Sequence, residues 1–314
     1  MNRSDSGIRR WLPAIRAIVV LAVGIGLIVV VYKAWQQLRN EPIALGQLDW
    51  LSLVIGVLLY SLTLVVTALY WRSALISLGG QVQPLAAVRA FAFSQLGKYL
   101  PGKAMVVVIR ADMVRSEQTR LGAAVASVFI ETLMWIFVGA QIASAYFLIS
   151  GNGGSWLKLL ALSIMIVSGL VTIPPNFKKL ARVVGKLKKS APITDAPEMT
   201  WATFLRGIVV LSIAWMIAGL SAQYVVGSIP GTEVVWSDFW LILATVALAT
   251  VGGFVSLIPG GIGVRELVII PLLAPRYSTA VALVAALLIR LVWIMSELLV
   301  SGTIELLYRY KNSR

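Results

Sequence analysis

The amino-acid sequence predicts an all-α polytopic membrane protein with about six full spans and two re-entrant helical hairpins, arranged as an inverted-topology repeat. Of its 314 residues, 59% are hydrophobic and 13% are charged, and the mean hydropathy is +0.89. Because a soluble domain needs a polar surface, this composition indicates an integral membrane protein. Two Pro-Gly segments also interrupt apolar runs, and similar features recur at one offset along the chain.

Six apolar segments are long enough to cross a bilayer, which requires about 20 residues. They are residues 13–32, 50–71, 121–149, 156–174, 204–226 and 278–308. No soluble region is longer than a loop, so we expect a single membrane domain over residues 1–314. The basic N-terminal segment lacks a convincing cleavage site, and we expect it to be retained as the first helix.

Pairs of shorter apolar segments flank the two Pro-Gly sites, residues 85–99 with 104–114 and residues 239–258 with 264–274. We expect each pair to form a hairpin that leaves the membrane on the side where it entered. An even number of full spans then returns the C-terminus to the side of the N-terminus. Non-helical backbone at membrane depth is tolerated only inside protein or against a water-filled cavity.

The loop charges predict the orientation. Asn176–Ser190 contains six lysines and arginines, whereas Gly227–Asp238 carries only Glu233 and Asp238. By the positive-inside rule the basic loop, residues 176–203, and both termini are cytoplasmic, in the inner (cytoplasmic) membrane. The net charge of +14 has the same explanation, and no nucleic-acid partner is expected. The first hairpin then enters from the cytoplasm and the second from outside.

An internal repeat supports this arrangement. The residues LPGK at 100–103 match IPGG at 258–261, so position 101 corresponds to position 259, an offset of 158. Glu131 precedes Arg290 by 159 positions, and Trp135 precedes Trp293 by 158. We place repeat one at about 50–149 and repeat two at about 204–308. Opposite entry sides predict an inverted repeat, which is typical of alternating-access transporters; chance alignment of apolar stretches is the alternative.

Charged side chains within the apolar segments are the candidate functional residues, because each costs about 2.5–3.5 kcal/mol on insertion scales. They are Lys98, Lys103, Glu131, Arg265, Glu266, Arg290 and Glu297. Arg265 and Glu266 begin a helix after Gly260, Gly261 and Gly263, where free backbone N–H groups and a guanidinium favour a phosphate. The glycines provide positive φ angles, close approach to a head group, or both.

Each candidate also has a structural interpretation. Arg265 or Glu266 either binds substrate or pairs with another buried charge. Lys98 and Lys103 either bind a phosphate or extend to the cytoplasmic surface. We expect Glu131 and Arg290 to pair across the pseudo-twofold axis, structurally or as a switch, and Glu297 to join their network. Trp135 and Trp293 either pack in the core or line a substrate path.

The segments KYLPGKAMVVVIRADMV and SLIPGGIGVRELVIIPLL resemble the two hallmark segments of the lysylphosphatidylglycerol synthase transmembrane-region family. The resemblance covers roughly residues 50–308. It implies a flippase-type membrane domain, as in the bacterial multiple peptide resistance factor; other members are linked to hopanoid or lipid-linked glycan pathways. This sequence ends shortly after its last helix, without the aminoacyl-transferase domain, so lipid lysylation is not expected.

We therefore expect a lipid translocase that moves a phosphate-bearing lipid between leaflets. The alternatives are a membrane-embedded enzyme and an accessory subunit of a lipid or lipid-linked glycan pathway. The chain contains no histidine and no cysteine, so we expect no catalytic site, metal site or cofactor. The expected partner is a membrane lipid, and a second copy of the chain or a biosynthetic protein is the candidate for assembly.

Overall fold

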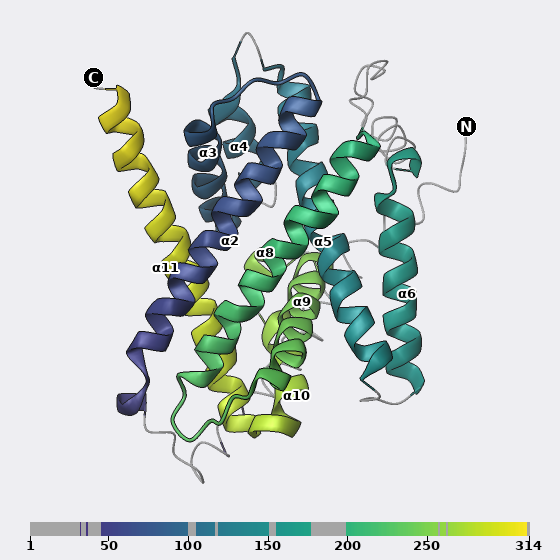
Figure 1. Ribbon diagram of the computed structural model, residues 1–314, viewed down its shortest axis with the longest axis vertical. Helices are drawn as coiled ribbons and strands as arrows, with labels where there is room; N and C mark the ends of the chain where they lie inside the picture. The colour runs from purple at the N-terminus through teal and green to yellow at the C-terminus, as the bar shows by residue number, and fades with distance from the viewer. Residues whose placement is uncertain are drawn as a thin grey trace, which may run out of the picture.

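The computed structural model describes residues 45–99, 105–116, 119–150, 155–176, 199–256, 258–261 and 263–312, together with Tyr32 and Gln36. Within these residues all regular structure is helical (Figure 1). The same residues contain five helices long and apolar enough to cross a membrane, so the chain is a multi-pass membrane protein. The predicted first span lies outside the described residues except for Tyr32, and so does most of the basic loop, residues 177–198.

Four long helices match predicted spans. They are α2 (Trp50–Ser77), α5 (Leu121–Ile149), α8 (Trp201–Gly227) and α11 (Thr279–Asn312). The segment predicted at 156–174 forms α6 (Ser155–Thr172), whose apolar part, Lys158–Thr172, is shorter than the other spans.

Local hydrogen bonds explain where two of these helices begin. The Asp49 carboxylate accepts the Leu51 N–H at 3.0 Å, and the Thr200 hydroxyl accepts the Thr203 N–H at 3.1 Å. Both are N-caps that satisfy otherwise unpaired N–H groups of the first turn. The Asp49 N–H also donates to the Ser228 carbonyl at 2.9 Å, so the start of α2 is tied to the end of α8.

Two pairs of shorter helices surround the Pro-Gly sites, as the sequence predicts. The first pair is α3 (Pro84–Leu96), continued by η2 (Gly97–Tyr99), and α4 (Met105–Val114). The second pair is α9 (Phe239–Val255), followed by η4 (Pro259–Gly261), and α10 (Val264–Tyr277). The members of each pair pack together. One difference is that Trp236–Val255, which includes the short helix η3 (Trp236–Asp238), is by itself long enough to cross a membrane.

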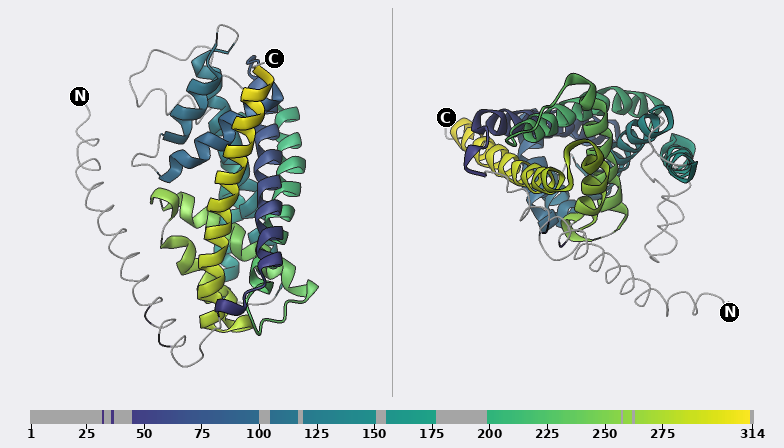
Figure 2. Two further views of the ribbon diagram at one scale, coloured as in Figure 1. Left: turned by 90° about the vertical axis from the view of Figure 1, so that its left-hand side faces the viewer. Right: turned by 90° about the horizontal axis from the view of Figure 1, so that it is seen from below.

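The two hairpins lie at opposite ends of the bundle. In Figure 1, α3 and α4 occupy the upper part, beside the C-terminus, whereas α9 and α10 occupy the lower part. The left view of Figure 2 shows the same separation from the side. The turns η2 and η4 contact each other, so the hairpin tips meet near the middle of the bundle.

Small residues bring the long helices close together. Ser221 of α8 donates a hydrogen bond of 2.7 Å to the Gly56 carbonyl of α2, and a Cβ at Gly56 would lie 3.1 Å from Val225. On α5, a Cβ at Gly139 would lie 2.6 Å from the Trp215 ring, which stacks on Trp135 with centroids 4.3 Å apart. Such close packing holds membrane helices together where lipid supplies no hydrophobic driving force. Trp135 therefore packs in the helix interface.

Candidate functional site

The loop before α10 is built from glycines that take positive φ angles. These angles are 62° at Gly260, 63° at Gly261 and 85° at Gly263. Residues with a side chain rarely adopt positive φ angles, so the turn requires glycine at these positions. The Gly261 N–H donates to the Ile258 carbonyl at 3.0 Å and closes the turn. The predicted positive-φ role of these glycines is confirmed.

Glu266 caps the helix that follows. Its Oε2 accepts the Gly263 N–H at 2.8 Å, and its Oε1 accepts a hydrogen bond of 2.9 Å from Arg290 Nη1. Both carboxylate oxygens are therefore engaged within the protein. For Glu266 the structure shows the pairing that we considered as the alternative to substrate binding, and this pairing fixes α10 to α11.

Arg265 lies between aromatic rings and glycines. Its guanidinium carbon is 4.9 Å from the centroid of the Trp293 ring, which stacks on Tyr60 at 5.1 Å. A Cβ at Gly253 would lie 3.1 Å from Arg265 Nε, and a Cβ at Gly261 would lie 3.0 Å from it. The backbone thus approaches the side chain closely from two sides, while the ring holds the cation from another.

Lys98 belongs to the first hairpin and also lies where the two hairpin tips meet. It lies in η2, which contacts η4, and it donates a hydrogen bond to Glu297 Oε1 of α11. The Glu297 side chain is fully buried, whereas the Lys98 side chain is 20% exposed. Arg265 and Arg290 are both near enough to act electrostatically on Lys98. Lys103, the second lysine predicted for this tip, lies outside the described residues.

These five residues form a central charge cluster, consisting of Lys98, Arg265, Glu266, Arg290 and Glu297. Three cations against two carboxylates leave a formal charge of +1. The hairpin tips bring together residues that are up to 199 positions apart in the chain. A partly buried excess of positive charge beside a glycine loop and a helix N-terminus is suited to an anionic group, such as a phosphate diester.

The predicted Glu131–Arg290 pair is wrong. Glu131 instead accepts a hydrogen bond of 2.6 Å from Arg110 Nη1, and Arg290 pairs with Glu266. The physical reason is that α4 and α10 each pack against the long helix that follows them, so each partner comes from the same half of the chain. Glu131 is therefore not part of the central charge cluster, whereas Glu297 is.

Arg110 is the buried charge that sequence analysis missed. Its side chain is 1% exposed, its Nε donates to Ser94 at 2.8 Å, and its guanidinium lies over the Phe91 ring at 4.2 Å. An arginine within the apolar segment VVVIRADMV is the signal that could have identified it. Glu131, Ser94 and the Phe91 ring all contact the Arg110 side chain, so its position indicates a structural role.

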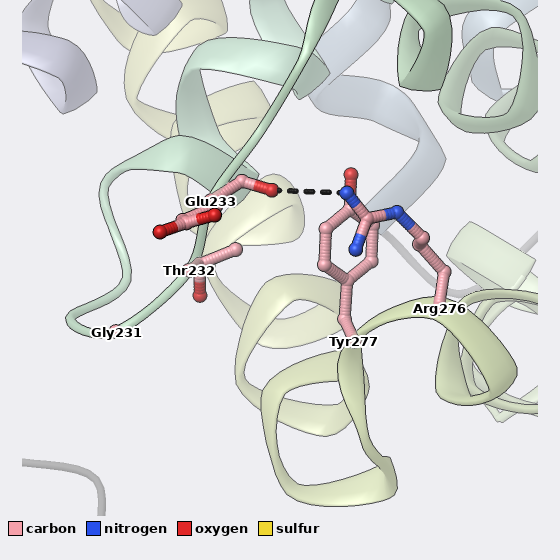
Figure 3. Close-up of a pocket in the computed structure, with 5 residues that line it drawn as sticks. All are labelled: Gly231, Thr232, Glu233, Arg276 and Tyr277. Carbon is pink, nitrogen blue, oxygen red and sulfur yellow. Dashed lines mark hydrogen bonds between the residues drawn. The ribbon is translucent and has the colours of Figure 1, made fainter.

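A pocket of about 280 Å³ lies beside the end of α10, which occupies the lower part of the bundle in Figure 1, and Figure 3 shows the residues that line it. Gly231, Thr232 and Glu233 line one side of it, and Arg276 and Tyr277 line the other. Arg276 binds both carboxylate oxygens of Asp238, at 2.9 and 3.0 Å, and donates to the Glu233 carbonyl at 3.2 Å. The arginine of this pocket is thus held by the protein, and we place the candidate site at the central charge cluster.

The fold and these buried charges define a polytopic membrane protein with two helical hairpins that meet inside the bundle. The sequence matches the family described as the lysylphosphatidylglycerol synthase TM region over residues 17–300, and the chain belongs to that family. The family comprises membrane domains linked to lipid modification and translocation. In a comparison with curated proteins, nothing matches the chain.

Proposed function

We propose that the protein is a lipid translocase, which moves a lipid with an anionic, phosphate-bearing head group between membrane leaflets. The observation that carries the proposal is the central charge cluster, where the tips of two hairpins from opposite ends meet. Ionisable residues within a membrane domain usually mark a substrate or ion path.

In this proposal the hairpins are re-entrant and belong to an inverted-topology repeat. Broken helices from two inverted halves bring their ends together near the bilayer midplane in many secondary transporters. The charge-exchanged pairs Arg110–Glu131 and Glu266–Arg290 support the repeat, because each joins the second hairpin helix to the following long helix. The side that carries the termini is cytoplasmic in the proposal.

Arg265 and the glycine loop hold the phosphate from one side, and Lys98 holds it from the other. The lipid tails stay in the bilayer, because only the head group needs a polar path. The proposal involves no bond-making step, so the protein acts as a carrier and not as an enzyme.

The experiment is reconstitution of the purified full chain into phosphatidylcholine vesicles with tail-labelled phosphatidylglycerol. A membrane-impermeant quencher added outside reports the label in the outer leaflet. Vesicles containing the protein should exchange the label between leaflets, whereas protein-free vesicles retain a protected inner fraction. Equal protection in the two preparations, with protein that remains folded, would refute the proposal.

A further inference from the structure

One face of α11 carries polar side chains at every fourth position. Trp293, Glu297, Ser301 and Glu305 follow one another at this spacing, which places neighbours on the same side of a helix. The helix rises about 1.5 Å per residue, so these four residues span about 18 Å. The face begins at the central charge cluster and runs toward the end of the bundle where the chain ends.

The first hairpin covers this face. α3 packs against α11, and one residue each from α3 and η2 pair with two of the polar side chains in reverse order. Lys98 reaches Glu297, and Arg89 reaches Glu305 at 2.6 Å nearer the end of the bundle. The Arg89 and Glu305 side chains are 29% and 19% exposed, so this second pair is open to solvent at its outer edge.

Several polar atoms along this face lack hydrogen-bond partners. Within the part of the chain that the structure describes, Glu297 Oε2, Ser301 Oγ and Trp293 Nε1 are buried and have none. The side chain of Ser301 is 5% exposed and that of Glu297 is inaccessible. Buried polar groups are nearly always satisfied, and water between neighbours about 6 Å apart is the ordinary way to satisfy them.

We propose that this face of α11 is a proton path, and that Glu297 is a proton-binding site that couples lipid movement to proton movement. Protons reach it from the Arg89–Glu305 pair through Ser301. The inference rests on the proposed function, because the coupled cargo is the anionic head group at the central charge cluster.

The charges determine the stoichiometry. When Glu297 is a carboxylate it neutralises Lys98, and the pair carries no net charge. One proton converts the carboxylate to the acid and raises the formal charge of the central charge cluster from +1 to +2, and one monoanionic head group beside Lys98 returns it to +1. Proton and lipid then move together in an electroneutral step, and the ion pair re-forms when both have left.

The charged and titratable groups that face Glu297 come from each neighbouring element. Lys98 pairs with Glu297, Arg265 and Arg290 act electrostatically on Lys98, and Glu266 pairs with Arg290. In addition, α3 supplies Arg89 beside Glu305, and α2 supplies Tyr60 behind Trp293. Arg206 is the charged residue that the structure describes in α8, and it acts electrostatically on Tyr70. Among these groups Glu297 is the carboxyl that is both fully buried and incompletely hydrogen-bonded.

The test uses the full chain in phosphatidylcholine vesicles with tail-labelled phosphatidylglycerol and an imposed pH difference. With one proton per lipid, each unit of pH difference shifts the leaflet ratio of the label about tenfold, toward the alkaline side. An imposed potential without a pH difference should leave the ratio unchanged. The end ratio does not depend on how the protein is oriented in the vesicle.

Three variants separate the roles. In vesicles with Glu297→Gln, the leaflet ratio of the label should stay near one. Ser301→Ala should reach the wild-type ratio but about tenfold more slowly, because it interrupts the path and not the site. Ser296→Ala is the matched control: its hydroxyl donates to the Val57 and Val292 carbonyls, at 2.9 and 2.8 Å, so it lies outside the path. It should change neither the ratio nor the rate.

Infrared difference spectra across a pH titration give a second readout that needs no transport. The wild type should show the carbonyl band of protonated carboxylic acids, and in Glu297→Gln this band should be smaller by the contribution of one group. Translocation that ignores the pH difference, or a carboxylic-acid band that Glu297→Gln does not diminish, overturns the inference. If no lipid moves at any pH while the band behaves as expected, the proton site stands and the proposed function fails. If Glu297→Gln does not fold, the slower approach of Ser301→Ala to the wild-type leaflet ratio tests the inference in its place.

Discussion

Arg110 of α4 donates a hydrogen bond of 2.6 Å to Glu131 of α5, and both side chains are buried. Glu266 of α10 and Arg290 of α11 form the corresponding pair in the second half, with the charges exchanged. Each pair fastens the returning helix of a hairpin to the next long helix. The hairpins are thereby anchored at one helix while their tips meet at the central charge cluster.

Removing one member of the first pair should destabilise the protein strongly. Glu131→Gln leaves the Arg110 guanidinium buried without its counter-ion, and such losses cost about 3–5 kcal/mol. Thermal or denaturant unfolding of the protein in detergent measures the effect. Arg309→Gln is the control, because Arg309 is 76% exposed and its pair with Glu305 is worth less than about 1 kcal/mol. Equal losses in the two variants would contradict a structural role for Arg110 and Glu131.

Arg265→Gln should slow transport strongly and leave the fold intact. A charge-assisted hydrogen bond contributes about 1.5–3 kcal/mol, which corresponds to roughly a tenfold to hundredfold loss of translocation rate. Arg276→Gln is the matched control, since Arg276 lies in the pocket at the end of the bundle and not at the hairpin tips. The measurement is vesicle translocation together with the unfolding temperature. An unfolded or degraded Arg265→Gln protein would instead favour a structural role.

Two adjacent glycines in α9 should behave differently. A Cβ at Gly253 would lie 3.1 Å from Arg265 Nε, whereas a Cβ at Gly252 would lie no closer than 3.7 Å to Val264. Gly253→Ala should displace Arg265 and slow translocation. Gly252→Ala should be neutral or slightly stabilising, because alanine is favoured over glycine in helices by about 1 kcal/mol. If the two variants have equal translocation rates, the position of Arg265 is not important for transport.

The predicted topology can be tested by labelling single cysteines, since the natural sequence contains none. The exposed residues Arg115 and Arg120 lie at the turn from the first hairpin to α5, and Glu233 and Arg276 lie at the far end. Cysteines at positions 115 and 120 should react with an impermeant reagent from the cytoplasm, and those at 233 and 276 from outside. Labelling of position 276 from the cytoplasm would refute the proposed orientation.

The sequence predicted the helices and the hairpin tips because apolar length and helix-breaking residues act locally. The repeat also identified Glu131 and Arg290, at an offset of 159, as corresponding positions. It did not identify their partners, because an offset says which residues are alike and not which residues touch. Arg110 and Glu266 become the partners only when α4 and α10 pack against α5 and α11.

The pair between Lys98 and Glu297 could not be predicted for a related reason. It joins residues 199 positions apart, from different halves of the chain, and depends on the contact between η2 and α11 that only the folded bundle creates. The polar face of α11 is visible in the sequence as the spacing from Trp293 to Glu305. Its burial against α3 is not visible there, and that burial turns a polar stripe into a candidate path.

The measurement that tests the central claim most directly is discrimination by head group. Tail-labelled phosphatidylglycerol and a tail-labelled diacylglycerol ether, which has the same tails and no phosphate, are followed in separate vesicles with the wild type and with Arg265→Gln. The account predicts that the wild type accelerates exchange of the phosphate-bearing lipid, and that Arg265→Gln loses this acceleration. Equal acceleration of both lipids by the wild type, or acceleration of phosphatidylglycerol that Arg265→Gln retains in full, would contradict it.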